Sequence, residues 1–169
     1  DAAVVFEQEY EGVEGDSASC AELYALLSSL SGLPLRQGIA VTGAVNQHGD
    51  LLPVGGINEK IEGYFRCCEV LGLDGQQGVL MPARNRRHLM LDERVVRAVS
   101  QGQFHIHVAD QVGDGLSLLT GLPFGELRAG GYPLDSVLGR TQKTLQRFRL
   151  ACESLALSRP QPRVRKHPH

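Results

Sequence analysis

Residues 38–60 read GIAVTGAVNQHGDLLPVGGINEK, and this stretch says most about the fold. Small and β-branched residues fill residues 38–45, which predicts a strand with Gly43 as a possible bulge. The polar run at residues 46–50 predicts a hairpin turn, and residues 51–54 are then the returning strand. A local antiparallel hairpin is therefore expected in the middle of the domain.

A helix is predicted on each side of this stretch. Upstream, Asp16 is expected as the N-cap of a helix over residues 17–30, which Gly32 ends. Downstream, Asn58 is expected to cap a second helix, which ends at Gly72. Each predicted helix thus begins beside a candidate site residue, Ser17 for the first helix and Lys60 for the second.

The other elements are shorter or less regular. The remaining predictions are strands at residues 3–10, 78–81 and 104–108, and helices at residues 92–100, 113–120 and 134–157. Because strands and helices alternate irregularly around one hairpin, the predicted fold class is α+β, a mixed sheet with packed helices. Residues 122–157 are expected to form a dangling C-terminal extension with one helix, and residues 158–169 a disordered basic tail.

Composition limits the possible functions. The 169 residues, 42% of them hydrophobic, suit one globular domain with a substantial core. A net charge of -2 gives little reason to expect nucleic acid or an anionic membrane, and only the RNRRH loop and the basic tail favour a nucleic-acid module. No apolar run approaches the ~20 residues of a membrane helix, and the N-terminal residues do not resemble a signal peptide.

The cysteines show no pattern of a metal site. Cys67 and Cys68 are adjacent on a predicted helix and point in different directions, and no C-x-x-C pair occurs. Together with Cys20 and Cys152 they are interpreted as buried or half-buried thiols in a reducing compartment, which predicts a cytoplasmic protein.

Ser17 lies in the motif EGDSAS, at the predicted start of the first helix. A serine hydroxyl is a poor nucleophile until a base takes its proton, so Ser17 needs a partner. Free backbone N–H groups at a helix start, here those of Ser17 and Ala18, could stabilise an oxyanion. The alternative is that Ser17 and Ser19 only support the helix start.

Histidine is not the expected base. His48 lies in the predicted hairpin turn, which favours a surface position. His105 and His107 are two residues apart on a predicted edge strand, and no third ligand suggests a metal site. No histidine and aspartate pair suggests a Ser-His-Asp arrangement, and no metal is predicted.

Lys60 is the more promising base. It lies in the apolar, glycine-rich passage VGGINEKIEGYF, on the first turn of its helix, where its charge opposes the helix dipole. A lysine in such surroundings should lose its proton more easily and could then deprotonate a serine. The alternative is a solvated lysine that pairs with Glu59 or Glu62.

Four pieces of the sequence, taken together, resemble the proteolytic domain of the Lon family. They are FEQEYEGVEGDSAS, GIAVTGAVNQHGDLLPVGGINEKIEGYF, GVLMPARN and FHIHVADQVGDGLSLLTG, and they follow one another from Phe6 to Gly121. The acidic form EGDSAS, with NEKIEGYF downstream, is most similar to the LonB-type branch. The resemblance places a Lon-type proteolytic domain at residues 1–121.

The resemblance implies a Ser-Lys dyad with Ser17 as nucleophile and Lys60 as general base. It implies that Thr42 orients the lysine, and that Glu14 and Asp16 shape the site. The expected function is a serine endopeptidase domain of an ATP-dependent protease, acting on unfolded or damaged proteins. The alternative is a catalytically silent Lon-like domain that serves assembly or binding.

The resemblance also implies a six-stranded α+β arrangement of the ribosomal-protein-S5-domain-2-like type, hexameric rings, and an AAA+ motor that delivers unfolded protein. The ATP-binding pattern G-x-x-x-x-G-K-[ST] does not occur in this sequence, so no cofactor is expected in this chain. ATP and Mg²⁺ would bind a motor in a longer parent chain. The abrupt opening strand suggests that the sequence was cut from such a parent.

Overall fold

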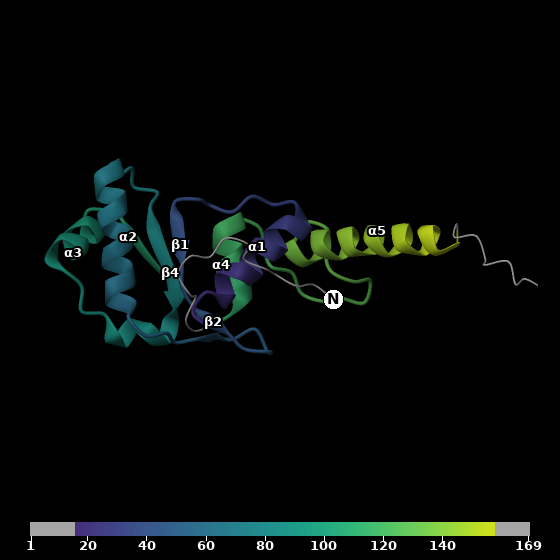
Figure 1. The fold of residues 1–169 in the computed structure, drawn as a ribbon, viewed down its shortest axis with the longest axis horizontal. Coiled ribbons are helices and arrows are strands. Elements are labelled where there is room, and N and C mark those ends of the chain that lie inside the picture. The colour runs from purple at the N-terminus through teal and green to yellow at the C-terminus, as the bar shows by residue number, and fades with distance from the viewer. Residues whose placement is uncertain (1–15, 158–169) are drawn as a thin grey trace, which may run out of the picture.

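The centre of the domain is a parallel sheet that is covered by helices on both faces. The computed structural model describes residues 16–157. The sheet has the strand order β1-β4-β5, with β1 at Ile39–Val41, β4 at Gly78–Pro82 and β5 at His105–Ala109. One face carries α2 (Ile57–Leu71) and α3 (Glu93–Ser100), and the other α1 (Ser19–Ser31) and α4 (Val112–Thr120), as Figure 1 shows.

The smaller elements lie at the margins of this sheet. They are the antiparallel pair β2 (Ala44–Val45) and β3 (Leu51–Leu52), the 3₁₀ helix η1 (Ala83–His88), and α5 (Val137–Leu157). In Figure 1, α5 projects from the body of the molecule, in line with its long axis. Parallel and antiparallel pairs together confirm a mixed arrangement with packed helices.

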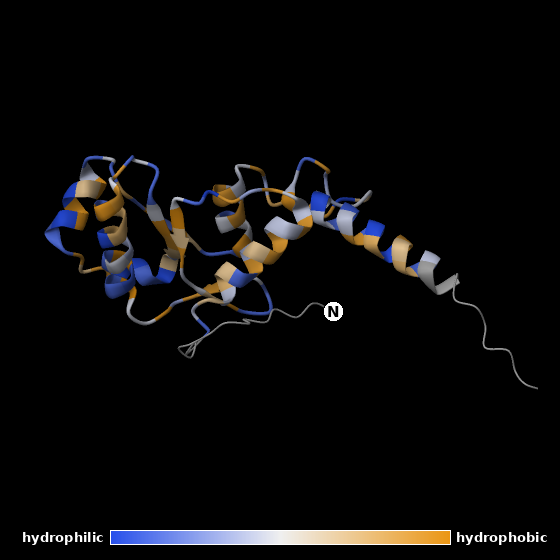
Figure 2. Cartoon of the chain, turned by 45° about the horizontal axis from the view of Figure 1, so that its top comes forward, coloured by the Kyte–Doolittle hydropathy of each residue, from blue (hydrophilic) through white to orange (hydrophobic). Residues whose placement is uncertain are grey.

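Strand β4 joins two hydrophobic cores. Val79 and Met81 are buried in the core formed with α2 and α3, whereas Leu80 is buried in the core formed with α1 and α4. Since successive side chains of a strand point to opposite faces, this all-apolar strand fills both cores at once. Figure 2 shows hydrophobic colour on the strands of the sheet and on parts of the helices beside it.

The single strand predicted at residues 38–45 is wrong. The structure divides it into β1 and β2, which belong to different sheets. The backbone leaves the parallel sheet at Gly43, whose N–H donates to Ser17 O at 2.9 Å and whose carbonyl accepts from Cys20 N at 3.1 Å. A Cβ on Gly43 would lie 3.3 Å from Pro82 Cγ, so the close approach favours glycine.

Both helix starts differ from the predicted caps. Ala18 is the N-cap of α1, and no side chain caps that end, because Asp16 contributes its backbone carbonyl instead of its carboxylate. Gly56, with φ of 63°, is the N-cap of α2. Asn58 lies inside α2 and bonds to another segment. The predicted helix ends at Gly32 and Gly72 are confirmed.

The C-terminal extension is not a dangling end. Val137 is fully buried in the core beside α1 and α4, and its N–H donates to Pro123 O at 3.0 Å. Phe124 packs over Gly113 of α4 so closely that a Cβ there would lie 2.7 Å from the ring. The first part of the extension is therefore an integral part of the fold.

Some sequence expectations concern residues that the structure does not describe, and others differ from it. The strand at residues 3–10, Glu14 and the tail at residues 158–169 lie outside the described residues. Within residues 16–157 there are five strands in two sheets, compared with the six implied for the family. Cys67 and Cys152 are exposed, contrary to expectation, whereas Cys20 and Cys68 are buried. None of the helices in this part of the chain is long and apolar enough to cross a bilayer.

Candidate active site

Ser17, Thr42 and Lys60 line one pocket, although they come from three separate elements. The pocket has a volume of about 330 Å³ and lies between the turn before α1, the end of β1, the first turn of α2 and the middle of β4. Its other walls are small or apolar, namely Ala18, Ala21, Ala40, Val41 and Val79. The structure thus brings together three of the five side chains expected in the site.

The turn that carries Ser17 is fastened to the end of β1. The Ser17 carbonyl accepts from Gly43 N, and Cys20 N returns a bond to the Gly43 carbonyl. Thr42 N donates to Leu80 O at 3.1 Å, which continues the parallel pairing with β4 for one more residue. These backbone bonds fix the serine turn relative to the sheet.

The two serines of EGDSAS have different roles. The Ser19 hydroxyl donates to Asp16 O at 2.7 Å and accepts from Val45 N at 3.1 Å, so it ties the turn to β2. The Ser17 hydroxyl has no hydrogen-bond partner within residues 16–157. Supporting the helix start is therefore the role of Ser19, and Ser17 keeps its hydroxyl in the pocket.

Lys60 approaches the site from the first turn of α2. Its Nζ donates to Thr42 Oγ1 at 3.4 Å, a long hydrogen bond. No ion pair with Glu59 or Glu62 forms, since the ion pairs within residues 16–157 all involve arginine. Lys60 is also exposed, so the apolar enclosure expected from its neighbours is incomplete among these residues.

Ser17 and Lys60 are not hydrogen-bonded to each other, although they share the pocket. Side-chain geometry of this kind is often loose in a site without substrate and tightens when substrate binds. Thr42 is buried, with 9% of its surface exposed, and contacts the lysine from the wall of the pocket. It is thus the one partner that restrains the Lys60 ammonium group in this part of the chain.

The backbone donors of the serine turn remain available. Ser17 and Ala18 precede the first helical residue, contrary to the prediction that they belong to the helix. Neither N–H has an acceptor within residues 16–157. Asp16 is exposed and its carboxylate makes no bond to Lys60, so no role for it in the site is apparent here.

Two asparagines that sequence reasoning did not assign to the site hold the segment leading to Lys60. The buried Asn85 of η1 accepts from Val54 N at 3.0 Å and donates to Val54 O at 2.9 Å. Asn58 donates to His88 O at 3.1 Å and accepts from Met90 N at 2.9 Å. These contacts join residues that are 30 to 32 positions apart in sequence, so no local sequence pattern predicts them.

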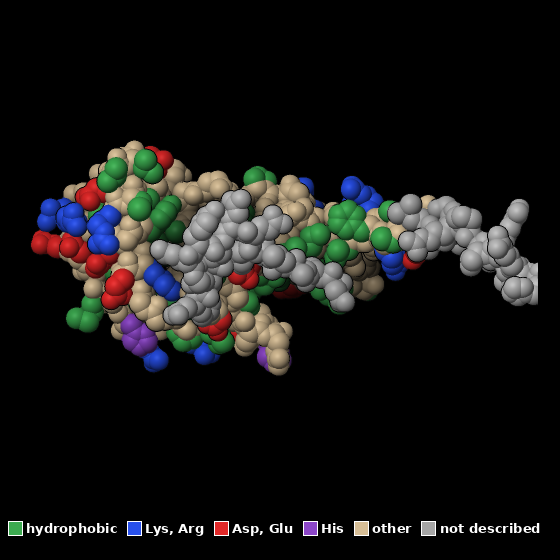
Figure 3. Space-filling view, viewed as in Figure 1, with side chains coloured by type: hydrophobic (Ala, Val, Ile, Leu, Met, Phe, Trp, Pro, Cys, Tyr) green, Lys and Arg blue, Asp and Glu red, His purple; other side chains and the backbone are tan. Residues whose placement is uncertain are grey.

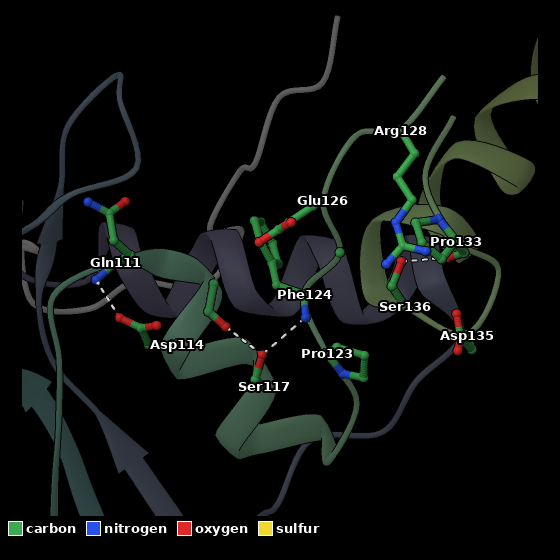
Figure 4. A pocket seen from close by; sticks show the side chains of 12 residues that line it. Gln111, Asp114, Ser117, Pro123, Phe124, Glu126, Arg128, Pro133, Asp135 and Ser136 are labelled. Atoms are coloured by element: carbon green, nitrogen blue, oxygen red, sulfur yellow. Dashed lines mark hydrogen bonds between the residues drawn. The ribbon is translucent and has the colours of Figure 1, made fainter. Parts of the chain in front are cut away.

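A larger pocket, of about 600 Å³, lies between α4 and the C-terminal extension. Figure 4 shows Ser117 and Ser136 in its walls, with no lysine or histidine beside them. Both hydroxyls are used structurally, because Ser117 bonds to Gly113 O and Phe124 N, and Ser136 bonds to Pro133 O and Gly139 N. This pocket therefore offers no activated nucleophile.

The histidines within residues 16–157 lie outside both pockets. His48 is exposed in the hairpin turn, as predicted. His105 and His107 stack on the edge strand β5 with ring centroids 5.8 Å apart, and His105 bonds to Gly75 O. No three of His, Cys, Asp and Glu come together as a metal site in the part of the chain that the structure describes.

Comparison with known proteins identifies the family. Residues 11–120 match the model of the Lon protease (S16) C-terminal proteolytic domain. This chain belongs to the Lon protease family. The matched range includes Ser17, Thr42 and Lys60, whereas α5 of this Lon domain lies beyond it.

Relatives carry the same family name. A putative Lon protease homolog of Escherichia coli (strain K12) is 52% identical over 121 residues, which is 72% of this chain and 21% of the relative. A putative Lon protease homolog of Haemophilus influenzae is 44% identical over 71% of this chain and 20% of its own length. An archaeal Lon protease of Methanothermobacter thermautotrophicus is 39% identical over 56% of this chain and 14% of its own length. The Lon domain described here thus corresponds to a small part of these proteins.

Proposed function

We propose that this Lon domain is a serine endopeptidase in which Ser17 is the nucleophile and Lys60 the general base. The observation that carries the proposal is the shared pocket, in which a serine with a free hydroxyl faces a lysine without a carboxylate partner among the described residues. Neutral lysine can take a proton from serine, and this pairing replaces the histidine of a Ser-His-Asp site.

The reaction begins when Lys60 Nζ takes the proton of Ser17 Oγ and the oxygen attacks the carbonyl carbon of the substrate. Rotation of the exposed Lys60 side chain brings the two groups together. The N–H groups of Ser17 and Ala18 stabilise the negative charge on the carbonyl oxygen. The Lys60 ammonium then gives its proton to the leaving amine, and an ester remains on Ser17.

Hydrolysis of the ester completes the cycle. Lys60, neutral again, takes a proton from a water molecule as its oxygen attacks the ester carbonyl. The bond between the carbonyl carbon and Ser17 Oγ then breaks, and the Lys60 ammonium returns the proton to Ser17 Oγ. Thr42 Oγ1 orients the lysine through both steps, since it accepts a hydrogen bond from Nζ. The products are a peptide with a new carboxyl end and a peptide with a new amino end.

Properties of the whole protein are proposed from the family. Unfolded or damaged proteins would be the substrates, copies of the domain would form a hexameric ring, and an AAA+ motor with ATP and Mg²⁺ would deliver the substrate. Four free cysteines support a reducing compartment such as the cytoplasm. A net charge of -2 gives no support for a nucleic-acid or membrane partner.

The test compares the parent with Ser17→Ala and Lys60→Ala on fluorogenic peptides and on unfolded casein, between about pH 6 and pH 10. Both variants should lose at least about 100-fold in kcat, because each lacks one partner of the proton transfer. Ser29→Ala, an exposed serine on α1, and Lys143→Ala, an exposed lysine on α5, are the matched controls.

Covalent labelling provides a readout that does not depend on turnover. A fluorophosphonate should modify Ser17 in the parent, as located by mass spectrometry, and should leave Ser17→Ala unlabelled. Circular dichroism verifies that each variant is folded. Cleavage by Ser17→Ala at the rate of the parent would exclude the Ser-Lys mechanism and favour the catalytically silent alternative with a contaminating activity.

A further inference from the structure

The 3₁₀ helix η1 directs one polar residue inward and three arginines outward. Asn85 is buried and bonded to backbone, whereas Arg84, Arg86 and Arg87 are exposed. Together with Ala83 the arginines line a hollow of about 760 Å³. Figure 3 shows Lys, Arg and His side chains on the surface at the lower end of α2, where η1 lies in Figure 1. Nothing in the proposed peptidase reaction uses these charges.

The three guanidinium groups have no carboxylate partner within residues 16–157. Every ion pair in this part of the chain uses an arginine of α3 or α5 instead. Hydrogen bonds from Asn46 and Gln111 lower the pKa of Asp50, and Arg84 contributes less to that effect. No carboxylate lines the hollow, and arginine stays charged at physiological pH. The hollow therefore suits an anionic ligand.

On the side of the sheet, η1 begins close to the catalytic pocket. Val79 of β4 lines that pocket, and Pro82, the last residue of β4, packs against Gly43, the neighbour of Thr42. Arg84 follows Pro82 by two residues, so their Cα atoms are at most about 7 Å apart. The strand that forms a wall of the pocket thus leads directly into the arginine cluster.

On the side of the helices, η1 is fastened to the first turn of α2. Asn58 donates to His88 O at 3.1 Å, and Lys60 belongs to the same turn of α2 as Asn58. An extended peptide advances about 3.3 Å per residue. A substrate chain that crosses Ser17 in the direction of η1 therefore reaches the arginines within roughly three to five residues of the scissile bond.

This position selects the kind of anion. A Lon proteolytic domain acts on polypeptides, so the chain that passes from the catalytic pocket to η1 is the substrate itself. Asp and Glu are the anionic side chains of a polypeptide, and their carboxylates can pair with arginine through two parallel hydrogen bonds. A nucleic-acid strand is less suited, because no aromatic residue lines the hollow to stack on a base.

We infer that Arg84, Arg86 and Arg87 form a subsite that binds Asp or Glu side chains of the substrate, about three to five residues from the cleaved bond. The inference rests on the proposed function, because it assigns a substrate preference to the same site. Apart from its three polar side chains, the catalytic pocket has small or apolar walls, which do not select for acidic residues. Selection for acidic segments is therefore the task of η1.

The first test measures binding to the complete 169-residue chain with Ser17→Ala, so that cleavage does not interfere. Two fluorescent peptides differ only in Glu or Gln at the third to fifth positions on both sides of the same central bond. In fluorescence anisotropy, the Glu peptide should have a dissociation constant at least about 10-fold lower. Equal constants would overturn the inference, as would displacement of the Glu peptide by a single-stranded oligonucleotide at lower concentration.

Substitutions locate the subsite. The triple variant Arg84→Gln, Arg86→Gln and Arg87→Gln, made in the Ser17→Ala chain, should bring the two dissociation constants to within about twofold of each other. Arg140→Gln is the matched control, because Arg140 is exposed on α5 and has no ion pair within residues 16–157, and it should leave the difference intact. A preference that survives the triple variant would place the acidic subsite elsewhere.

Turnover separates this inference from the proposed function. With Ser17 present, the ratio of kcat/KM between the Glu and Gln peptides should be at least about 10, and the three arginine substitutions should bring it close to 1. If neither peptide is cleaved, the proposed peptidase activity fails, while the ratio of dissociation constants still decides whether η1 binds acidic segments. Cleavage of both peptides with equal kcat/KM would support the peptidase and refute the subsite.

Discussion

The side-chain amide of Asn85 forms two hydrogen bonds with the backbone of Val54, one to its N–H at 3.0 Å and one to its carbonyl at 2.9 Å. This pairing resembles one rung of a sheet, with a side chain in place of the second strand. It fixes η1 to the segment that turns into α2, and so it controls where the first turn of α2 begins. The place of Lys60 in the pocket depends on where that first turn lies, because Lys60 is part of it.

Replacement of Asn85 by Ala should be strongly destabilising. Asn85 is 2% exposed, so the change leaves two backbone groups of Val54 without partners in a buried environment, at a cost of about 2–4 kcal/mol in the free energy of unfolding. Asn58→Ala also removes two bonds to backbone, but at a more exposed position where water replaces them, and should cost about 1 kcal/mol or less. Urea denaturation measures both, and equal losses would contradict the importance of burial.

Thr42 offers a test of how the lysine is oriented. Thr42→Val keeps the shape of the buried side chain but removes the oxygen that accepts from Lys60 Nζ, so kcat should fall about 10-fold or more with little change in KM. Thr42→Ser retains the acceptor and should keep most of the activity. If the valine and serine variants were equally active, the hydrogen bond would have no part in catalysis.

Gly115 of α4 lies against Tyr24 of α1. A Cβ there would overlap the hydroxyl of Tyr24 and lie 2.7 Å from Tyr24 Cζ, so Gly115→Ala should destabilise the domain by about 1–3 kcal/mol. Gly63→Ala in α2 finds its nearest atom 3.9 Å away and should instead stabilise by about 0.5–1 kcal/mol.

The double variant Tyr24→Phe with Gly115→Ala tests the cause. Because it removes the overlapping hydroxyl, it should recover part of the stability that Gly115→Ala loses. Thermal and urea denaturation of the four proteins give the coupling. Additive effects of the two substitutions would show that the clash lies elsewhere.

Stability should fall in mild acid in part because of His107. Burial, with smaller contributions from His105 and Arg36, holds the pKa of His107 below its ordinary value of 6.5. As pH drops below about 6.5, the unfolded chain therefore takes up the proton more readily than the folded one, and the free energy of unfolding decreases. Above about pH 6.5, His107 is neutral in both the folded and the unfolded chain, and this loss of stability is absent.

Comparison with His107→Gln isolates this effect. The carboxylates are the same in both proteins, so the difference between the two stability curves reports His107. The parent should lose more stability than the variant between pH 7.5 and pH 5.5, as measured by urea denaturation at a series of pH values. Parallel curves would mean that His107 binds protons equally in both states.

Val137 tests whether the C-terminal extension belongs to the core. It is 0% exposed, and Val137→Ala should cost about 2 kcal/mol in the free energy of unfolding. Leu150→Ala, further along the same helix at 59% exposure, should change it by less than about 0.5 kcal/mol. A similar small effect at both positions would indicate an extension that does not stabilise the domain.

Much of the fold could be predicted because its signals are local. Gly32, Gly72 and Gly121 end their helices with positive φ values that glycine adopts without strain, and Gly32 and Gly72 were recognised as helix ends from the sequence. The turn at residues 46–50 likewise contains the polar and glycine residues that a hairpin requires. Elements bounded by such residues were placed correctly to within a few positions.

The errors arose where a side chain or backbone group bonds to a distant segment. Asn58 has the composition of a helix cap, but its amide is used by the chain after η1. Gly43 looked like a bulge inside one strand, yet its bonds to the serine turn separate two sheets. Local propensity carries no information on bonding partners that are distant in sequence. It therefore could not exclude a cap at Asn58 or a bulge at Gly43.

From its sequence alone, this protein could be recognised as a Lon-type domain with Ser17 and Lys60 as the candidate pair, because residue types and spacing carry the chemistry. Only the tertiary structure decided that Ser19, and not Ser17, supports the helix start, that Thr42 contacts the lysine, and that the extension joins the core. Those outcomes depend on hydrogen bonds and packing between segments far apart in the chain, and such contacts exist only once the chain has folded.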